Sequence, residues 1–218
     1  NGFAPYVGAE HLESQGHFPS ARFRGYKGDA WDGGHRIPFI ARWPREIPAG
    51  TTCDELVCLS DLLRTCAEVV GSDLPVDAGE DSVSILPLLR SGSAGRPVPP
   101  VRSHVVHHSA QGKFAIRDGR WKLVLCPGSG GPWSLSDADA AAEGLPLVQL
   151  YDMEADPGER ENLHARYPER AREMIRLLEE LVAKGRITPG PDQPNDAEID
   201  IWKLDTMPGV DASALSDY

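Results

Sequence analysis

The sequence contains no apolar run long enough to span a bilayer, so we expect no membrane-spanning segment. It is also short of positive charge: 22 lysines and arginines stand against 33 aspartates and glutamates, for a net charge of −11. Such a chain offers no basic patch to neutralise phosphates, which argues against nucleic acid as a partner. An anionic substrate would need positive charge placed locally, against the field of the whole chain.

Cysteines are few, and their spacing matches no metal-binding pattern. The four are Cys53, Cys58, Cys66 and Cys126, with no Cys-x-x-Cys pair. Cys58 and Cys66 lie among apolar residues, so we expect buried thiols, while a Cys53–Cys58 disulfide stays open for an exported protein. The sequence begins with a polar segment at Asn1 and no secretory signal. We therefore expect a cut or incomplete chain, and the missing signal does not locate the protein.

The most informative stretch is a glycine-rich loop over residues 25–36. Its four glycines let the backbone turn sharply and approach a ligand closely, and Lys27 lies between two of them. A lysine on such a loop can meet an anion as a compact point charge. The run after Pro38 predicts a core strand over 37–43, and loops that leave core strands often carry chemistry. The alternative is a surface loop with a solvated lysine.

Helical periodicity follows this loop. Apolar residues at helical spacing predict a helix over 62–70, ended by Gly71, with an apolar face that includes Cys66. A second helical turn is expected near 84–92. Residues 91–102, rich in Gly, Ser, Pro and Arg, form the best linker candidate.

The second half of the sequence predicts a small antiparallel α+β unit. Strands are expected at 105–108, 114–117, 121–125 and 147–151, with an Asp118-Gly119 hairpin turn. Residues 126–144, between the last two strands, are interpreted as a polar, Gly/Ala-rich insertion. An amphipathic helix follows, from Pro168 to a Gly185 cap, with Leu178 in its apolar stripe. Lys113 and Lys122 are interpreted as solvated hairpin charges. Residues 188–218 are expected to run over the surface as a tail.

Several motifs in order resemble the sulfatase family. Lys27-Gly28 followed by Trp31-Asp32-Gly33-Gly34-His35-Arg36-Ile37-Pro38 is similar to the family's lysine-glycine and acidic-Gly-Gly-x-Arg-Val/Ile-Pro pattern. Asn1-Gly2 looks like the end of its Asp-Asn-Gly element. The segments 114–123 and 150–163 resemble its C-terminal hairpin and its Leu-Tyr-Asp…Asp-Pro-x-Glu stretch. The resemblance covers nearly the whole chain and corresponds to roughly the last half of a family member.

This resemblance implies the fold and the domains. Residues 1–102 would be the C-terminal part of a large α/β catalytic domain with an alkaline-phosphatase-like fold, which we expect to be incomplete here. Residues 103–187 would be the small α+β C-terminal domain, and 188–218 an extended tail. The missing N-terminal half of the same protein would be the partner of this chain. Resemblance to bacterial sulfatases also favours the periplasm or secretion.

The family's activity implies a hydrolase of sulfate esters that acts on a sulfated small molecule or carbohydrate. Its nucleophile is formylglycine, made from the Cys or Ser of a Cys/Ser-x-Pro-x-Arg motif, and this motif is absent from the chain. Calcium polarises the ester. The fragment alone is therefore expected to be inactive, and calcium is expected not to bind to it.

Two site residues carry over from the family's motifs, and His108 is a further candidate. Lys27 matches the lysine that contacts sulfate, and Asn1 matches the metal-ligand asparagine, although a frayed terminus is the alternative. His108 could contact substrate from the small domain, or could be satisfied by a local hydrogen bond. Asp32, with its neighbours Gly33, Gly34 and Arg36, is interpreted as scaffolding for the loop.

Two other functions stay open. One is a related metal-dependent phospho- or phosphonate-ester hydrolase of the same superfamily, which would be distinguished by its upstream nucleophile. The other is a non-catalytic binding module.

Overall fold

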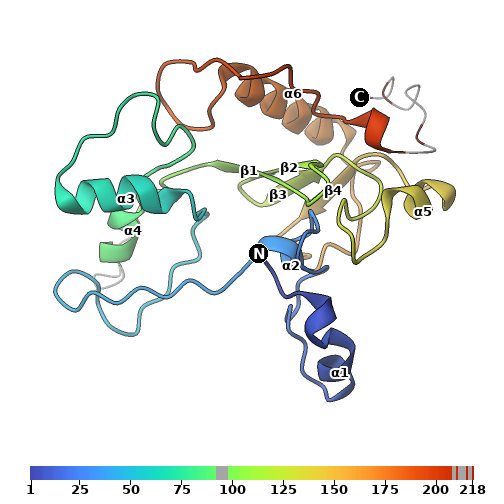
Figure 1. The fold of residues 1–218 in the computed structure, drawn as a ribbon, viewed down its shortest axis with the longest axis horizontal. Coiled ribbons are helices and arrows are strands. Elements are labelled where there is room, and N and C mark those ends of the chain that lie inside the picture. The colour runs from blue at the N-terminus through green and yellow to red at the C-terminus, as the bar shows by residue number, and fades with distance from the viewer. Residues whose placement is uncertain (92–97, 208–209, 211–214, 216–217) are drawn as a thin grey trace. The chain divides into compact units, whose positions relative to one another are not determined.

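The computed structural model describes residues 1–91, 98–207, 210, 215 and 218, which form two compact units. The first unit holds Asn1–Ile37, Val106–Glu179 and Ile199–Tyr218, and the second holds Pro38–Val105 and Glu180–Glu198 (Figure 1). Each unit thus joins segments that are far apart in sequence. No helix within the described ranges is long and apolar enough to cross a bilayer. The division of the chain at residues 102 and 187 stays a prediction.

A four-stranded sheet in the order β1 (His104–His108), β2 (Phe114–Asp118), β3 (Trp121–Val124) and β4 (Gln149–Asp152) organises the first unit. β2 and β3 form an antiparallel hairpin in which Asp118 lies opposite Trp121, and β3 pairs antiparallel with β4. Gly119 turns the hairpin with a φ of 55°. The Asp-Gly signal and the strand pattern are confirmed, since both depend on contacts that are local in sequence.

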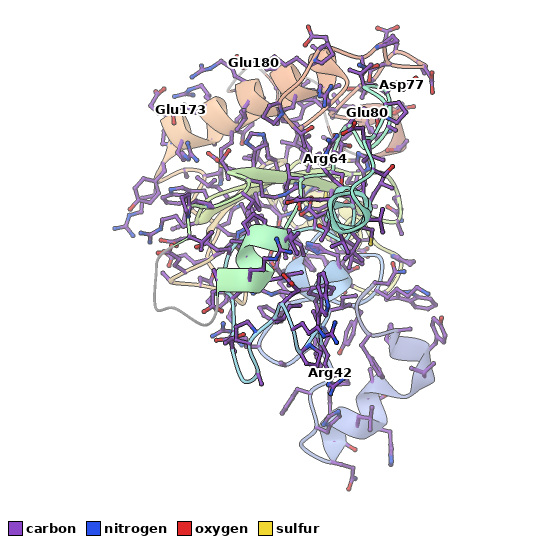
Figure 2. The ribbon with its side chains drawn as sticks, turned by 90° about the vertical axis from the view of Figure 1, so that its left-hand side faces the viewer. Arg42, Arg64, Asp77, Glu80, Glu173 and Glu180 are labelled. Atoms are coloured by element: carbon purple, nitrogen blue, oxygen red, sulfur yellow. The ribbon has the colours of Figure 1, made fainter. Side chains whose placement is uncertain are left out.

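Helix α6 (Pro168–Lys184) begins and ends where its sequence predicts. Gly185 takes the left-handed conformation expected of a cap, with a φ of 63°. The predicted stripe is buried, and Met174 and Leu178 have no exposed surface. Glu173 and Glu180, two turns apart on this helix, are both exposed (Figure 2). In its first turn Arg170 donates to Asp118 at the hairpin over 2.5 Å.

Short helices complete the first unit: η1 (Pro5–Val7), α1 (Ala9–Ser14), α2 (Asp32–His35), α5 (Asp137–Ala142) and η2 (Leu204–Thr206). The last of these lies in the predicted tail, where Met207 is buried in a cluster with Ala30, Val124 and other core residues. Ile201 and Met207 are therefore core residues of this unit, and the expectation of a surface tail is wrong for them.

Lys113 is fully buried, so its interpretation as a solvated charge is wrong. Its Nζ lies 2.5 Å from the Thr206 hydroxyl and 3.3 Å from the Lys203 carbonyl, and 3.6 Å from an Asp137 carboxylate oxygen. A buried ammonium is tolerated when oxygens replace its water, and here η2 and α5 supply them. Lys113 thus fastens the tail to the start of β2.

The second unit contains α3 (Asp61–Val70) and α4 (Leu86–Ser91), both near the predicted positions. Fully buried Asp61 accepts hydrogen bonds from the backbone N–H groups of Cys58 at 2.8 Å and Val83 at 3.0 Å. It also pairs with Arg102. Residues 92–97 of the predicted linker lie outside the described residues.

The predicted strand over 37–43 is not formed. These residues have no regular secondary structure, and Phe39 and Ile40 are 44% and 90% exposed. A strand is stable only beside a neighbour that completes its hydrogen bonds, and in the described part of the chain no segment pairs with this one. A pattern of strand-forming residues is therefore not sufficient here.

The apolar face of α3 is likewise exposed, at Leu62, Leu63 and Val70, and so is Cys66. The expectation of a buried Cys66 thiol is wrong, and Cys58 is only half-buried. The helix turns Asp61 and Thr65 inward instead, because both hydrogen bond to the backbone of residues 83–85. All four cysteines are free thiols, so the Cys53–Cys58 disulfide is not formed.

Candidate anion-binding site

Direct backbone-to-backbone packing gives the glycine-rich loop its shape. Gly2 donates its N–H to the Gly34 carbonyl at 2.8 Å, and a Cβ at Gly2 would lie 1.7 Å from the Gly33 oxygen. A Cβ at Gly33 would lie 2.2 Å from the Gly25 oxygen, and one at Gly34 would lie 2.1 Å from the Asp29 oxygen. No side chain fits at these three positions. The start of the chain, the Lys27 turn and α2 therefore form one rigid backbone assembly.

Lys27 lies at the turn of this assembly. The Lys27 N–H donates to the Phe3 carbonyl at 2.9 Å. The carbonyl of the following residue, Gly28, accepts a hydrogen bond from the Ala110 N–H at 2.7 Å. Lys27 is half-buried, and its side chain makes no hydrogen bond or ion pair with any residue that the structure describes. The loop thus presents an ammonium group that has no protein partner, which suits it to an anion.

The buried carboxylate of Asp29 closes the same turn. It accepts a hydrogen bond from the Tyr26 N–H at 2.8 Å and another from the Ser134 hydroxyl. Burial raises the pKa of this carboxyl, and the two donors act against that rise. Gly131 packs so closely that its Cβ would lie 2.1 Å from an Asp29 carboxylate oxygen. The segment 128–134 is therefore part of the site.

Sequence reasoning missed this segment by treating residues 126–144 as a polar insertion. The available signal was a second glycine cluster, Gly128, Gly130 and Gly131. Two glycine-rich segments in one chain can pack backbone against backbone, but their pairing cannot be deduced from spacing alone.

Beneath the loop lies a buried ion cluster of Lys122, Asp32 and Glu159. The Lys122 ammonium is 2.8 Å from an Asp32 oxygen and 2.7 Å from a Glu159 oxygen, and all three side chains are buried. The second Glu159 oxygen accepts the Asp32 N–H at 2.6 Å. The interpretation of Lys122 as a solvated charge is wrong. Because β3 is buried on both faces at Lys122, its ammonium needs internal partners, and α2 and the Glu159 turn provide them.

The two carboxyls of this cluster have opposite pKa shifts. Burial alone would raise the pKa of Asp32, but the Lys122 charge outweighs it and holds the pKa well below its usual range. Burial raises the pKa of Glu159, and Lys122 opposes that rise. Asp32 is therefore the stronger acid of the two carboxyls that contact Lys122. Arg36 adds a contact to Asp32 at 3.2 Å, in agreement with a scaffolding role for this motif.

Two stacked histidines lie beside the ion cluster. The rings of His35 and His107 are 3.9 Å apart, and Nε2 of His107 donates to the Ala30 carbonyl at 3.1 Å. Burial, followed by the Lys122 charge, lowers the pKa of His35 to about 4. Burial also lowers the pKa of His107 well below its usual value. Both rings are therefore neutral at pH 7, and neither adds positive charge.

The structure brings the segments of all three predicted site residues to one place. Asn1 is exposed and precedes Gly2, which is fixed to α2. His108 is exposed at the end of β1, with its ring edge-on to Phe114 at 4.2 Å between centroids. The chain after His108 reaches Gly28 through Ala110. The individual roles of Asn1, Lys27 and His108 remain predictions.

The described residues group few ligands that would suit calcium. Within residues 1–91, 98–207, 210, 215 and 218, no group of three or more His, Cys, Asp or Glu side chains could hold a metal ion. Asn1 offers one amide oxygen, whereas calcium takes about six to eight oxygen ligands.

Comparisons with known proteins identify the relatives of this chain. It is 33% identical over 196 residues to the steryl-sulfatase of Mus musculus, which covers 83% of this chain. It is 32% identical over 171 residues, 75% of the chain, to an N-acetylgalactosamine-6-O-sulfatase of Bacteroides thetaiotaomicron. No family model matches.

A solved structure supports the same relationship. It comes from work on the metabolism of multiple glycosaminoglycans by Bacteroides thetaiotaomicron, and it covers 78% of this chain with a TM-score of 0.64 and 29% identity. The chain is a sulfatase homologue. It spans 31% of the mouse relative, 30% of the bacterial one and 34% of the solved chain.

Proposed function

We propose that this chain is part of a sulfatase that hydrolyses sulfate esters to an alcohol and inorganic sulfate, and that Lys27 contacts the sulfate. The observation that carries the proposal is the unpartnered ammonium of Lys27 on a loop fixed by Gly2, Gly33 and Gly34. The sulfatase relatives support the reaction, and the resemblance of Lys27-Gly28 to the family's motif supports the role of the residue.

The rigid loop suits this chemistry. The distribution of negative charge on the sulfate oxygens changes as the ester bond breaks. A cation that is already held in position stabilises this charge, and the protein does not have to reorganise to provide it. The glycine packing and the Lys122 cluster hold the backbone of the Lys27 turn in place. The Lys27 ammonium then supplies local positive charge in a chain of net charge −11.

The remaining parts of the proposal concern the longer protein. Formylglycine supplies the hydroxyl nucleophile in this family, and these 218 residues do not contain its Cys/Ser-x-Pro-x-Arg motif. Residues 1–102 would complete an alkaline-phosphatase-like α/β domain with the segment that we propose precedes Asn1. In that protein Asn1 would be one calcium ligand and His108 would face the substrate.

The test compares the 218-residue chain with the longer protein that we propose. We expect only the longer protein to release inorganic sulfate from sulfate esters, and we expect Lys27→Ala to abolish most of this release. Lys184→Ala is the matched control, because Lys184 is an exposed lysine at the end of α6. Faster hydrolysis of phosphate or phosphonate esters would favour the alternative hydrolase. If the 218-residue chain released more sulfate than its own Lys27→Ala variant, the proposal that activity requires the longer protein would be contradicted.

A further inference from the structure

An exposed aromatic pair lies beside the Lys27 loop. Tyr6 is 63% exposed and Trp133 is 49% exposed, and their ring centroids are 5.4 Å apart at an angle of 52°. Covering a large aromatic ring removes apolar surface from water, which is favourable. Two neighbouring exposed rings therefore commonly mark a binding surface. None of the contacts described above uses either ring, so the pair has no role in the fold that we can identify.

Both rings are carried by segments attached to the Lys27 turn. Phe3, whose carbonyl accepts the Lys27 N–H, is followed directly by η1, which contains Tyr6. On the other side, Pro132 lies 3.2 Å from the position of a Cβ on Gly28. Trp133 follows Pro132, and the next residue, Ser134, is bonded to Asp29. The two rings therefore border the turn that presents the free ammonium.

The chemistry of this border fits a sugar ring. The C–H groups on one side of a pyranose form an apolar face that stacks on an aromatic ring, while its hydroxyls remain in water or reach a phenol such as Tyr6. Ligand sites commonly combine aromatic walls with a small number of placed polar groups. A chain of net charge −11 gives an anionic substrate no general attraction, so contact with an uncharged ring would supply affinity that the overall field does not.

We propose that Tyr6 and Trp133 form a platform for the sugar ring of a sulfated carbohydrate whose sulfate group reaches Lys27. This inference rests on the proposed sulfatase function, and it narrows the substrate to a carbohydrate. The N-acetylgalactosamine-6-O-sulfatase among the relatives supports that class of substrate. Lys27 binds the charged group, and the aromatic pair recognises the body of the substrate.

The experiment measures two properties of the longer protein. The first is kcat/KM for a sulfated glycosaminoglycan disaccharide and for 4-nitrophenyl sulfate. The second is binding of the desulfated disaccharide, followed by saturation-transfer NMR, which requires no turnover. The variants are Tyr6→Ala, Trp133→Ala and the conservative Trp133→Phe. Tyr167→Ala is the control, because Tyr167 is 38% exposed and packs on Trp121 instead of at the loop.

We expect Trp133→Ala to lower kcat/KM for the disaccharide by about 10- to 100-fold, with most of the change in KM, as for loss of an aromatic anchor. Activity on 4-nitrophenyl sulfate should change by less than about threefold, and Trp133→Phe should recover part of the loss. Desulfated disaccharide should bind to the wild type and to Tyr167→Ala, but not to Trp133→Ala.

An equal loss on both substrates would show that the rings only support the loop, and would overturn the platform. Unchanged kinetics in both Tyr6→Ala and Trp133→Ala would also overturn the platform. The same conclusion would follow if binding of the desulfated sugar did not depend on Trp133. If the protein hydrolyses no sulfate ester but still binds the desulfated sugar through Trp133, the proposed function fails while the carbohydrate platform stands.

Discussion

Replacing Lys122 with methionine would remove the ammonium from a buried cluster and leave Asp32 and Glu159 facing each other. The ammonium lies 2.8 and 2.7 Å from the two carboxylates. At an effective dielectric constant of about 20, each contact is worth roughly 6 kcal/mol. Repulsion between the carboxylates and the desolvation of all three groups offset most of this attraction. We expect a net loss of about 3–5 kcal/mol in the free energy of unfolding, as for other broken buried pairs.

The loss should depend on pH, and its sign follows from the pKa shifts. In the wild type Lys122 holds the pKa of Asp32 below its unfolded value, so this stabilisation is present at neutral pH and is lost as acid protonates the group. In Lys122→Met, burial without a partner raises both carboxyl pKa values, and protonation then favours the folded state. The difference between variant and wild type should therefore be large at pH 7 and smaller near pH 4.

Urea unfolding followed by tryptophan fluorescence measures this difference at both pH values. Lys184→Met serves as the control, because it removes an exposed lysine of α6 and should change stability by less than about 0.5 kcal/mol. Lys122→Met combined with Glu159→Gln should recover part of the stability, since one buried charge is then gone. A loss below about 1 kcal/mol at pH 7, or an equal loss at both pH values, would refute the buried-cluster argument.

Three other predictions follow from the site and the core. Lys27→Ala in the longer protein should lower kcat/KM by about 10²–10³ with little change in melting temperature, and Lys27→Arg should restore little of it; retention of more than about a third of the activity would make Lys27 a surface charge. Leu178→Ala should cost about 2–5 kcal/mol in a reversible melt, because the side chain is fully buried on α6; a cost below about 0.5 kcal/mol would contradict this burial. His35 should titrate near pH 4 by NMR. Its folded pKa lies below the unfolded value, so protonation favours unfolding and stability should fall as pH drops below about 6.5; a pKa near 6.5 would show that the ring is solvated.

The parts of the fold that the sequence predicts correctly are those with local causes. The β2–β3 hairpin depends on Asp118-Gly119 and the alternation around it, and α6 depends on Pro168, a repeating apolar stripe and Gly185. Each signal lies within a few residues of the structure it produces. The glycine spacing around Lys27 is also a local signal. It predicts that another backbone segment packs closely against the loop, although it does not identify that segment.

The parts that the sequence does not predict depend on distant partners. Lys122 has the same side chain whether it faces water or two carboxylates, and Asp32 and Glu159 are 90 and 37 residues away from it in the sequence. Trp133 looked like part of an irregular insertion, because its place beside Tyr6 arises only when Gly131 packs on Asp29. Residues 37–43 show the opposite error, because their sequence pattern predicts a strand that is not formed. No described segment pairs with these residues.

The glycine packing of the loop also bears on how such a site can change over evolutionary time. At Gly2, Gly33 and Gly34 even a methyl group would collide with a backbone atom, so mutation cannot adjust the loop in small steps. Exposed rim positions such as Tyr6 and Trp133 can be exchanged at little cost to folding. A mutant library built to redirect substrate choice should therefore leave the three glycines unchanged and randomise the rim, where selection has graded variation to act on.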